Sequence, residues 1–213
     1  PKKDQSYVLY HLSQDNLKHM LFPVGELEKP QVRAVAHEAG LSNADKLESQ
    51  DICFVPDGDY ASFIEEHTGE EFVPGSIVDE AGNMLGTHNG LVHYTIGQRK
   101  GLGIAAGEPL FVLAKNADTN TLVVGPASSA GVTEVVADDV NLISVEQIDE
   151  PLEVEVKVNY RAVPRKALVH MEGEKLVARF DEPVRAVAPG QALVMYQGDV
   201  VVGGGTIESA TRG

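Results

Sequence analysis

The chain has 213 residues, of which 43% are hydrophobic, so it is long enough and apolar enough to bury a core. Its formal net charge of −15 at pH 7 excludes a protein that adsorbs to nucleic acid through an overall excess of positive charge. Its single cysteine excludes an intrachain disulfide and zinc sites built from several cysteines.

The first part of the chain, residues 1–58, is expected to be helical. The pattern of residues 6–40 is typical of helices. Pro30 suits a first helical turn, apolar residues recur from Val32 at the spacing i, i+3, i+4, i+7, and Gly40 ends the run. We therefore expect one amphipathic helix before Gly40.

The periodicity changes after a short apolar run at residues 51–55 and the turn that closes it. Residues 60–67 are expected to form one more short helix, ending near Gly69. From Phe72 onward, short runs of β-forming residues alternate with turn residues at fairly regular intervals. This pattern predicts a small central β domain over residues 59–128.

The last part of the chain, residues 129–213, contains five further strand-like runs separated by glycine turns, a pattern that favours a barrel or a sandwich, and we expect a C-terminal β barrel. They are residues 152–160, 166–171, 175–180, 192–196 and 200–207. Gly203-Gly204-Gly205 is interpreted as a bend where residues without Cβ let backbones approach closely. Asp138-Asp139 is placed in a surface loop. The predicted fold class is mainly β with a helical N-terminal segment (α+β).

Cys53 is the one thiol of the chain. By composition alone, a lone cysteine in an apolar frame is an inert buried residue. Its position between a polar stretch and a turn would instead let it reach solvent. A reactive thiolate needs a cationic neighbour or backbone donors, and the immediate neighbours of Cys53 are acidic, so the local sequence does not supply activation.

Residues 94–104 combine three glycines with two cations, Arg99 and Lys100. The spacing differs from the phosphate-binding patterns GxGxxG and GxxxxGK(S/T), which disfavours a dinucleotide site and a P-loop. Two alternatives stay open, a glycine-rich turn with solvated cations and a loop that contacts phosphate.

The densest basic patch of the chain has an aromatic residue inside it. Its members are Lys157, Tyr160, Arg161, Arg165 and Lys166. An aromatic ring among cations suits a stacked base flanked by phosphates, whereas the alternative is an ordinary charged face. The seven histidines show no HExxH spacing, and no metal site is expected.

Six motifs in order make the chain resemble, almost from end to end, the tRNA-specific 2-thiouridylase family (tRNA-uridine 2-sulfurtransferases). The motifs are Lys3-Asp4-Gln5-Ser6-Tyr7, Leu21-Phe22-Pro23-Val24-Gly25, Glu48-Ser49-Gln50-Asp51-Ile52-Cys53-Phe54, residues 94–104, Pro189-Gly190-Gln191 and Gly203-Gly204-Gly205. Any one of them alone would be unspecific, whereas their order and spacing together are specific.

The resemblance implies a mechanism in which ATP activates the C2 oxygen of the wobble uridine (U34) of tRNA and a cysteine persulfide delivers sulfur to C2. Cys53 matches the persulfide cysteine, which a second cysteine in the family's N-terminal domain attacks and with which it can form a disulfide. By similarity, the residues that contact tRNA are Lys3, Asp4, Gln5, Tyr160, Arg161 and Gln191.

The partners that the resemblance implies are tRNA, specifically the Lys, Glu and Gln isoacceptors, and a sulfur-relay or cysteine-desulfurase donor protein. ATP is expected to bind the family's N-terminal domain, whose SGGxDS loop and second cysteine do not occur in this sequence. We therefore expect a C-terminal fragment without a cofactor of its own that is inactive alone.

The single cysteine favours a reducing, cytoplasmic location. Nothing suggests secretion, and no stretch approaches the roughly 20 apolar residues of a membrane span. A non-catalytic tRNA-binding β-barrel module is the alternative function. A methyltransferase ranks last, because the sequence has no glycine-rich strand-to-helix turn for a nucleotide-like methyl donor.

Overall fold

The computed structural model describes residues 4–46, 55, 59–69 and 71–212. The chain divides into two units, one made of Pro1–Asp15 and Phe72–Gly213 and the other of Asn16–Glu71. Among the helices in the described ranges, none is long and apolar enough to cross a membrane.

The helices are short and lie in the first third of the chain. They are the 3-10 turn η1 (Ser6–Leu9), α1 (Gln14–Lys18), α2 (Lys29–Glu38) and α3 (Tyr60–Thr68). The helix predicted around Pro30 is confirmed as α2. The backbone amide of Glu28, the residue just before this helix, donates a hydrogen bond to the Gln31 side chain at 2.7 Å. The expectation of a helical pattern throughout residues 6–40 was too broad, since loops separate η1, α1 and α2.

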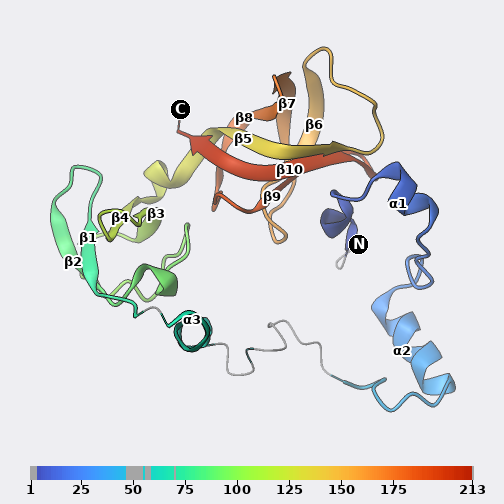
Figure 1. Cartoon of the computed structure of the whole chain (residues 1–213), viewed down its shortest axis with the longest axis horizontal. Coiled ribbons are helices and arrows are strands. Elements are labelled where there is room, and N and C mark those ends of the chain that lie inside the picture. The colour runs from blue at the N-terminus through green and yellow to red at the C-terminus, as the bar shows by residue number, and fades with distance from the viewer. Residues whose placement is uncertain (1–3, 47–54, 56–58, 70, 213) are drawn as a thin grey trace. The chain divides into compact units, whose positions relative to one another are not determined.

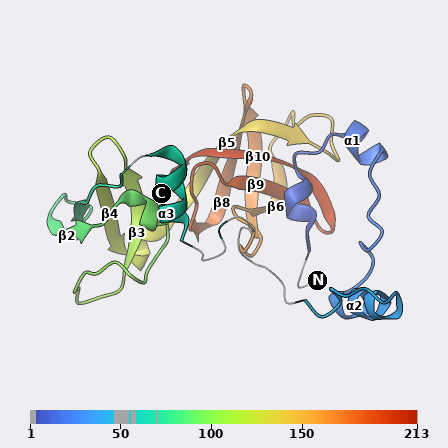
Figure 2. The same cartoon turned by 60° about the horizontal axis from the view of Figure 1, so that its bottom comes forward.

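Helix α3 confirms the second predicted helix, and both of its ends have clear local causes. The Asp59 carboxylate accepts a hydrogen bond from the Ser62 amide at 3.1 Å, which caps the N-terminus. Gly69 adopts φ +70°, a left-handed conformation that glycine reaches without steric cost, and this ends the helix. Both α2 and α3 are visible in Figure 2.

The central part of the chain is a four-stranded sheet with strand order β2-β1-β4-β3. Its elements are β1 (Gly75–Val78), β2 (Met84–His88), the turn η2 (Leu91–His93), β3 (Leu110–Asn116), β4 (Thr121–Pro126) and the turn η3 (Ala127–Ala130). β1 pairs antiparallel with β2 and parallel with β4, whereas β3 and β4 form an antiparallel hairpin. The core of the sheet includes Ile77, Leu122 and Val124, and two residues of the glycine-rich segment, Tyr94 and Leu102, pack with them.

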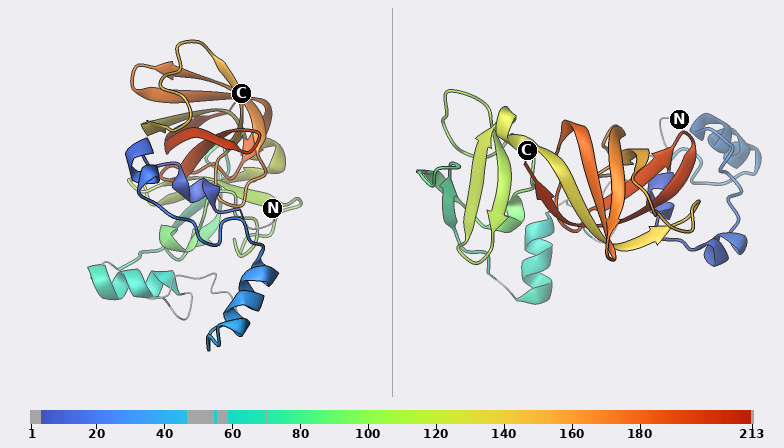
Figure 3. Two further views of the ribbon diagram at one scale, coloured as in Figure 1. Left: turned by 90° about the vertical axis from the view of Figure 1, so that its right-hand side faces the viewer. Right: turned by 90° about the horizontal axis from the view of Figure 1, so that it is seen from above.

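The last part of the chain is a closed barrel of six strands in the order β10-β5-β8-β7-β6-β9, which confirms the predicted mainly β fold class (Figures 1 and 3). The strands are β5 (Gly131–Leu142), β6 (Leu152–Lys157), β7 (Arg165–Glu172), β8 (Lys175–Arg185), β9 (Ala192–Gln197) and β10 (Val200–Thr211). Alternate residues point inward, as in β6, where Val154 and Val156 are buried and the alternating glutamates, Glu153 and Glu155, are exposed. Closure leaves no free edge among these strands.

The glycine triplet of β10 has the role predicted for it. A Cβ at Gly203 would overlap the Asn141 carbonyl oxygen, and one at Gly204 would overlap the Leu193 carbonyl oxygen. The register of β10 shifts between Val201 and Gly203 in its pairing with β9 and between Gly204 and Thr206 in its pairing with β5. The absence of side chains therefore lets β10 curve closely against β5 and β9.

The placement of Asp138-Asp139 in a surface loop was wrong, because both residues lie within β5. Asp139 has φ +47°, next to a shift in the pairing of β5 with β10. Acidic residues and a positive φ are typical of turns, and here they mark a bulge inside a long strand.

Candidate nucleic-acid interface

The segment that follows the N-terminus is attached to the barrel through Tyr7. The Tyr7 side chain is 6% exposed and packs with Val194 and Tyr196 of β9. Its hydroxyl donates a hydrogen bond to the Ala192 carbonyl at 2.7 Å. Burial raises the pKa of the Tyr7 hydroxyl, so it stays a neutral donor. In Figure 1 the dark blue segment lies beside β9 and β10.

This attachment brings Gln5 onto Tyr160, a residue of the connection between β6 and β7. The Gln5 side-chain amide donates to the Tyr160 hydroxyl at 2.8 Å. The rings of Tyr7 and Tyr160 meet edge to face, with centroids 6.0 Å apart. The Lys157 ammonium lies 5.3 Å from the centroid of the Tyr7 ring and 5.7 Å from that of Tyr160. Two aromatic rings thus hold a cation at the surface of the barrel.

Asp4 adds a negative charge beside this cluster. Partial burial raises the pKa of the Asp4 carboxyl, but the Ser6 backbone amide, the Ser6 hydroxyl and the charge of Lys157 outweigh it, so the net shift is downward. The Ser6 amide donates to the Asp4 carboxylate at 2.8 Å. Asp4 is therefore an ionised acceptor that fixes the start of the segment.

The structure brings together some of the residues expected to contact tRNA. Gln5 and Tyr160 touch directly, and Arg161 follows Tyr160 in an exposed turn where its backbone amide donates to the Asn159 side chain at 3.0 Å. Gln191 is exposed and immediately precedes the residue whose carbonyl binds Tyr7. Cys53 and Lys3 lie outside the described residues.

Sequence reasoning missed the part played by Tyr7, which anchors the whole arrangement. The signal available was an aromatic residue two positions after Gln5 in an otherwise polar stretch. Its partner in β9 is 185 positions away, and nothing local in the sequence identifies that partner.

The glycine-rich segment forms a loop on the central sheet. Gly97, Gly101 and Gly103 all have positive φ. The Lys115 ammonium donates to the carbonyls of Leu91 at 3.1 Å and Tyr94 at 3.0 Å, which fixes the start of the loop.

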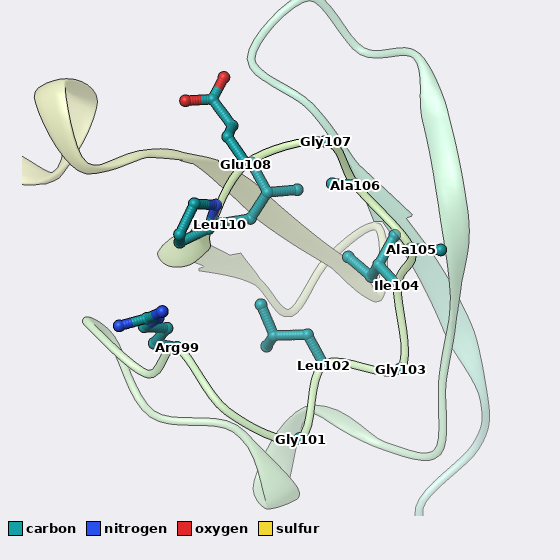
Figure 4. Close-up of a pocket in the computed structure, with 11 residues that line it drawn as sticks. Arg99, Gly101, Leu102, Gly103, Ile104, Ala105, Ala106, Gly107, Glu108 and Leu110 are labelled. Carbon is teal, nitrogen blue, oxygen red and sulfur yellow. The ribbon is translucent and has the colours of Figure 1, made fainter.

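The loop lines an open pocket of about 670 Å³ (Figure 4). Leu102 and Ile104 lie on its wall, and the Glu108 carboxylate points away from Arg99. Arg99 and Lys100 are exposed, so the loop presents cations to solvent from a buried apolar base.

Comparisons with protein families cover nearly the whole chain. The model described as tRNA methyl transferase HUP domain matches residues 1–57, the tRNA methyl transferase PRC-barrel domain matches residues 61–126, and the aminomethyltransferase β-barrel domain matches residues 132–207.

Curated relatives match over the same length. A protein of Acetivibrio thermocellus named tRNA-specific 2-thiouridylase MnmA is 50% identical over 208 residues, covering 97% of this chain and 58% of the relative. A protein of the same name from Clostridioides difficile is 48% identical, and the match covers 98% of this chain and 58% of the relative. Another from Carboxydothermus hydrogenoformans is 49% identical, and the match covers 97% of this chain and 57% of the relative. The chain thus spans somewhat more than half the length of these relatives, and it belongs to the tRNA-specific 2-thiouridylase family.

Proposed function

We propose that this chain is part of an enzyme that transfers sulfur from a cysteine persulfide to C2 of the ATP-activated wobble uridine (U34) of tRNA. In this proposal Cys53 carries the persulfide, and the surface around Gln5 and Tyr160 binds tRNA. The observation that carries it is the 2.8 Å hydrogen bond between these two residues, which are 155 positions apart. The proposed reaction follows the name of the relatives, tRNA-specific 2-thiouridylase. This chain covers 58% of the length of the Acetivibrio thermocellus relative, so the activity of the whole protein is a proposal for this chain.

The chemistry of the surface supports contact with RNA. The Tyr160 side chain is 43% exposed, the Lys157 ammonium lies 5.7 Å from the centroid of its ring, and Arg161 follows it directly in the sequence. An exposed ring can stack on an unpaired base while the neighbouring cations neutralise phosphates. Because the chain carries a net charge of −15, RNA contact has to be confined to such a local basic surface.

The proposed sulfur transfer proceeds in two steps. The terminal sulfur of the Cys53 persulfide attacks C2, a carbon–sulfur bond forms, and the activated oxygen leaves with AMP. A second thiolate then attacks the Cys53 sulfur and forms a disulfide, and the sulfur–sulfur bond breaks so that the transferred sulfur stays on the base. Two thiols are thereby oxidised to one disulfide, which an external reductant of the dithiol class restores.

The sequence contains one cysteine, whereas the second step needs two thiols. We therefore propose that the 213-residue chain forms no 2-thiouridine on its own. Robust ATP-dependent formation of 2-thiouridine by the purified chain would refute this. A tRNA substrate would also place the protein in the cytoplasm, together with the sulfur-relay or cysteine-desulfurase protein that loads Cys53.

The test of the function is Cys53→Ser in the full-length protein, with Ser42→Ala as a control outside the cysteine motif of residues 48–54. Each protein is incubated with ATP, a sulfur donor and the Lys, Glu and Gln tRNAs, and digested tRNA is analysed by mass spectrometry. We expect no 2-thiouridine with Cys53→Ser, nearly unchanged tRNA affinity, and normal product with the control. Thiolation by Cys53→Ser would sink the assignment, and a methyl group in place of sulfur would favour a methyltransferase.

The alternative is a non-catalytic tRNA-binding module. It is favoured by the observation that the described candidate contacts lie on the barrel and on the segment attached to it. If labelled tRNA binds the isolated chain with a salt-dependent affinity and Cys53 never acquires sulfur from any donor in the complete protein, the module is the better description.

A further inference from the structure

An open groove of about 510 Å³ lies at one end of the barrel, between the β6–β7 connection and the end of β8. Three arginines line it, Arg161 and Arg165 from the connection and the start of β7, and Arg185 from the end of β8. They are three of the seven arginines in the whole sequence. Its other lining residues, all within the described part of the chain, are Asn159 and apolar residues, and none carries a carboxylate.

The positive charge of this groove is poorly neutralised by the protein. Arg165 is 3.5 Å from Glu182, with both side chains more than half exposed, so water screens this pair strongly. Within the described ranges no carboxylate forms an ion pair with Arg161 or Arg185. By contrast, the Arg179 guanidinium contacts Glu134 at 2.8 Å. Two guanidinium groups of this groove, those of Arg161 and Arg185, therefore have no carboxylate partner in the described part of this acidic protein.

The groove adjoins the glycine-rich loop. Gly97 has φ +85° and approaches Ala186 so closely that a Cβ on it would lie 2.9 Å from the Ala186 Cβ. Ala186 lines the groove, and its carbonyl accepts a hydrogen bond from the Asn159 side chain at 3.4 Å. Arg99 and Lys100 follow this contact by two and three residues along the chain. The contact between Gly97 and Ala186 thus joins the arginine-lined groove to the loop that carries Arg99 and Lys100.

We propose that this groove binds the phosphodiester backbone of RNA and that the bound strand continues past Ala186 toward Arg99 and Lys100. The planar guanidinium fork of arginine matches two phosphate oxygens at once. No aromatic residue lines the groove, so bases stack elsewhere, on the exposed ring of Tyr160 next to Arg161. The inference rests on the proposed tRNA function and adds to it Arg165, Arg185 and the glycine-rich loop.

The test compares Arg185→Gln with Arg179→Gln in the 213-residue chain, using fluorescently labelled tRNA at several concentrations of monovalent salt. Both changes remove one positive charge from β8, but Arg179 lies outside the groove. A phosphate contact contributes about 0.7–0.9 to the slope of log affinity against log salt. Losing one contact therefore weakens binding about fivefold to eightfold at 0.1 M salt but only about twofold to threefold at 0.3 M.

We expect Arg185→Gln to show this salt-dependent loss and Arg179→Gln to match the wild type, with circular dichroism showing both folded. Arg185→Lys is expected to keep the salt slope while losing part of the affinity, because it keeps the charge and loses the fork. If both variants still bind tRNA and Arg185→Gln and Arg179→Gln have equal slopes of log affinity against log salt, the proposed role of the groove is wrong. The proposed function would not be affected by this result.

Two further outcomes separate the groove from the proposed function. No tRNA binding by any variant at low salt would overturn both the groove and the tRNA surface. In the remaining arm, ATP and inorganic phosphate are titrated in place of RNA. The proposal would be overturned if ATP or inorganic phosphate binds at micromolar concentration, and if Arg185→Gln abolishes this binding while its tRNA affinity stays unchanged. The groove would then be assigned to a small phosphate ligand.

Discussion

Replacing Tyr7 with alanine is expected to detach the N-terminal segment from the barrel and, with it, to weaken tRNA binding. A buried tyrosine removes about 150–250 Å² from water, which at about 25 cal/mol per Å² corresponds to about 4–6 kcal/mol as an upper value. Large-to-small changes at buried aromatic positions cost about 3–5 kcal/mol. Tyr7→Phe removes only the 2.7 Å hydrogen bond to Ala192, worth about 0.5–1.5 kcal/mol.

The two variants separate the contribution of the ring from that of the hydroxyl. Urea unfolding gives the total loss of stability, and hydrogen exchange of residues 4–10 reports whether the segment leaves the barrel before the barrel unfolds. Val8→Ala is the control, since Val8 lies in the same segment and is 46% exposed. Wild-type exchange, stability and tRNA affinity in Tyr7→Ala would refute the idea that Tyr7 holds this surface together.

Three other changes test the fold and its electrostatics. Gly204→Ala would place a Cβ against the Leu193 carbonyl and is expected to lower the free energy of unfolding in urea by about 1–3 kcal/mol or more. Gly86→Ala is the control, because open space surrounds Gly86, and it should cost little. Equal losses of stability in the two variants would contradict this. Lys115→Met removes the donor to Leu91 and Tyr94, so amide exchange of residues 94–104 should accelerate while that of the barrel stays unchanged; no change in the loop would argue against this tether. Burial raises the pKa of the Tyr7 hydroxyl above its ordinary value of 10.0. The neutral hydroxyl therefore stabilises the fold fully below pH 10, and this stabilisation is lost as the pH rises further. Between pH 9 and 11 the wild type should therefore lose more stability than Tyr7→Phe, and parallel curves would count against the buried neutral hydroxyl.

Elements with a strong local signal could be predicted from the sequence. Pro30 and Gly40 bracket a helix, Gly69 ends another, and the alternation of β6 matches a barrel strand. The glycines of β10 were interpreted correctly because close backbone approach has few other solutions in a strand. In each case the physical cause lies within a few residues of the pattern.

Features that depend on distant partners could not be predicted. The strand β5 carries Asp139 at a positive φ, and only its pairing with β10 explains why this turn-like pair sits inside a strand. Likewise, local sequence could not show that Gln5 meets Tyr160 or that Arg185 shares a groove with Arg161. The resemblance to a known family identified candidate residues in the sequence. Only the fold shows which of them lie close together.

The most direct test of the tRNA surface is hydrogen exchange of the 213-residue chain with and without saturating tRNA. We expect the amides of residues 4–10 and 158–162 to gain protection together, because one surface contains both segments. Bound tRNA that protects neither segment would contradict the account.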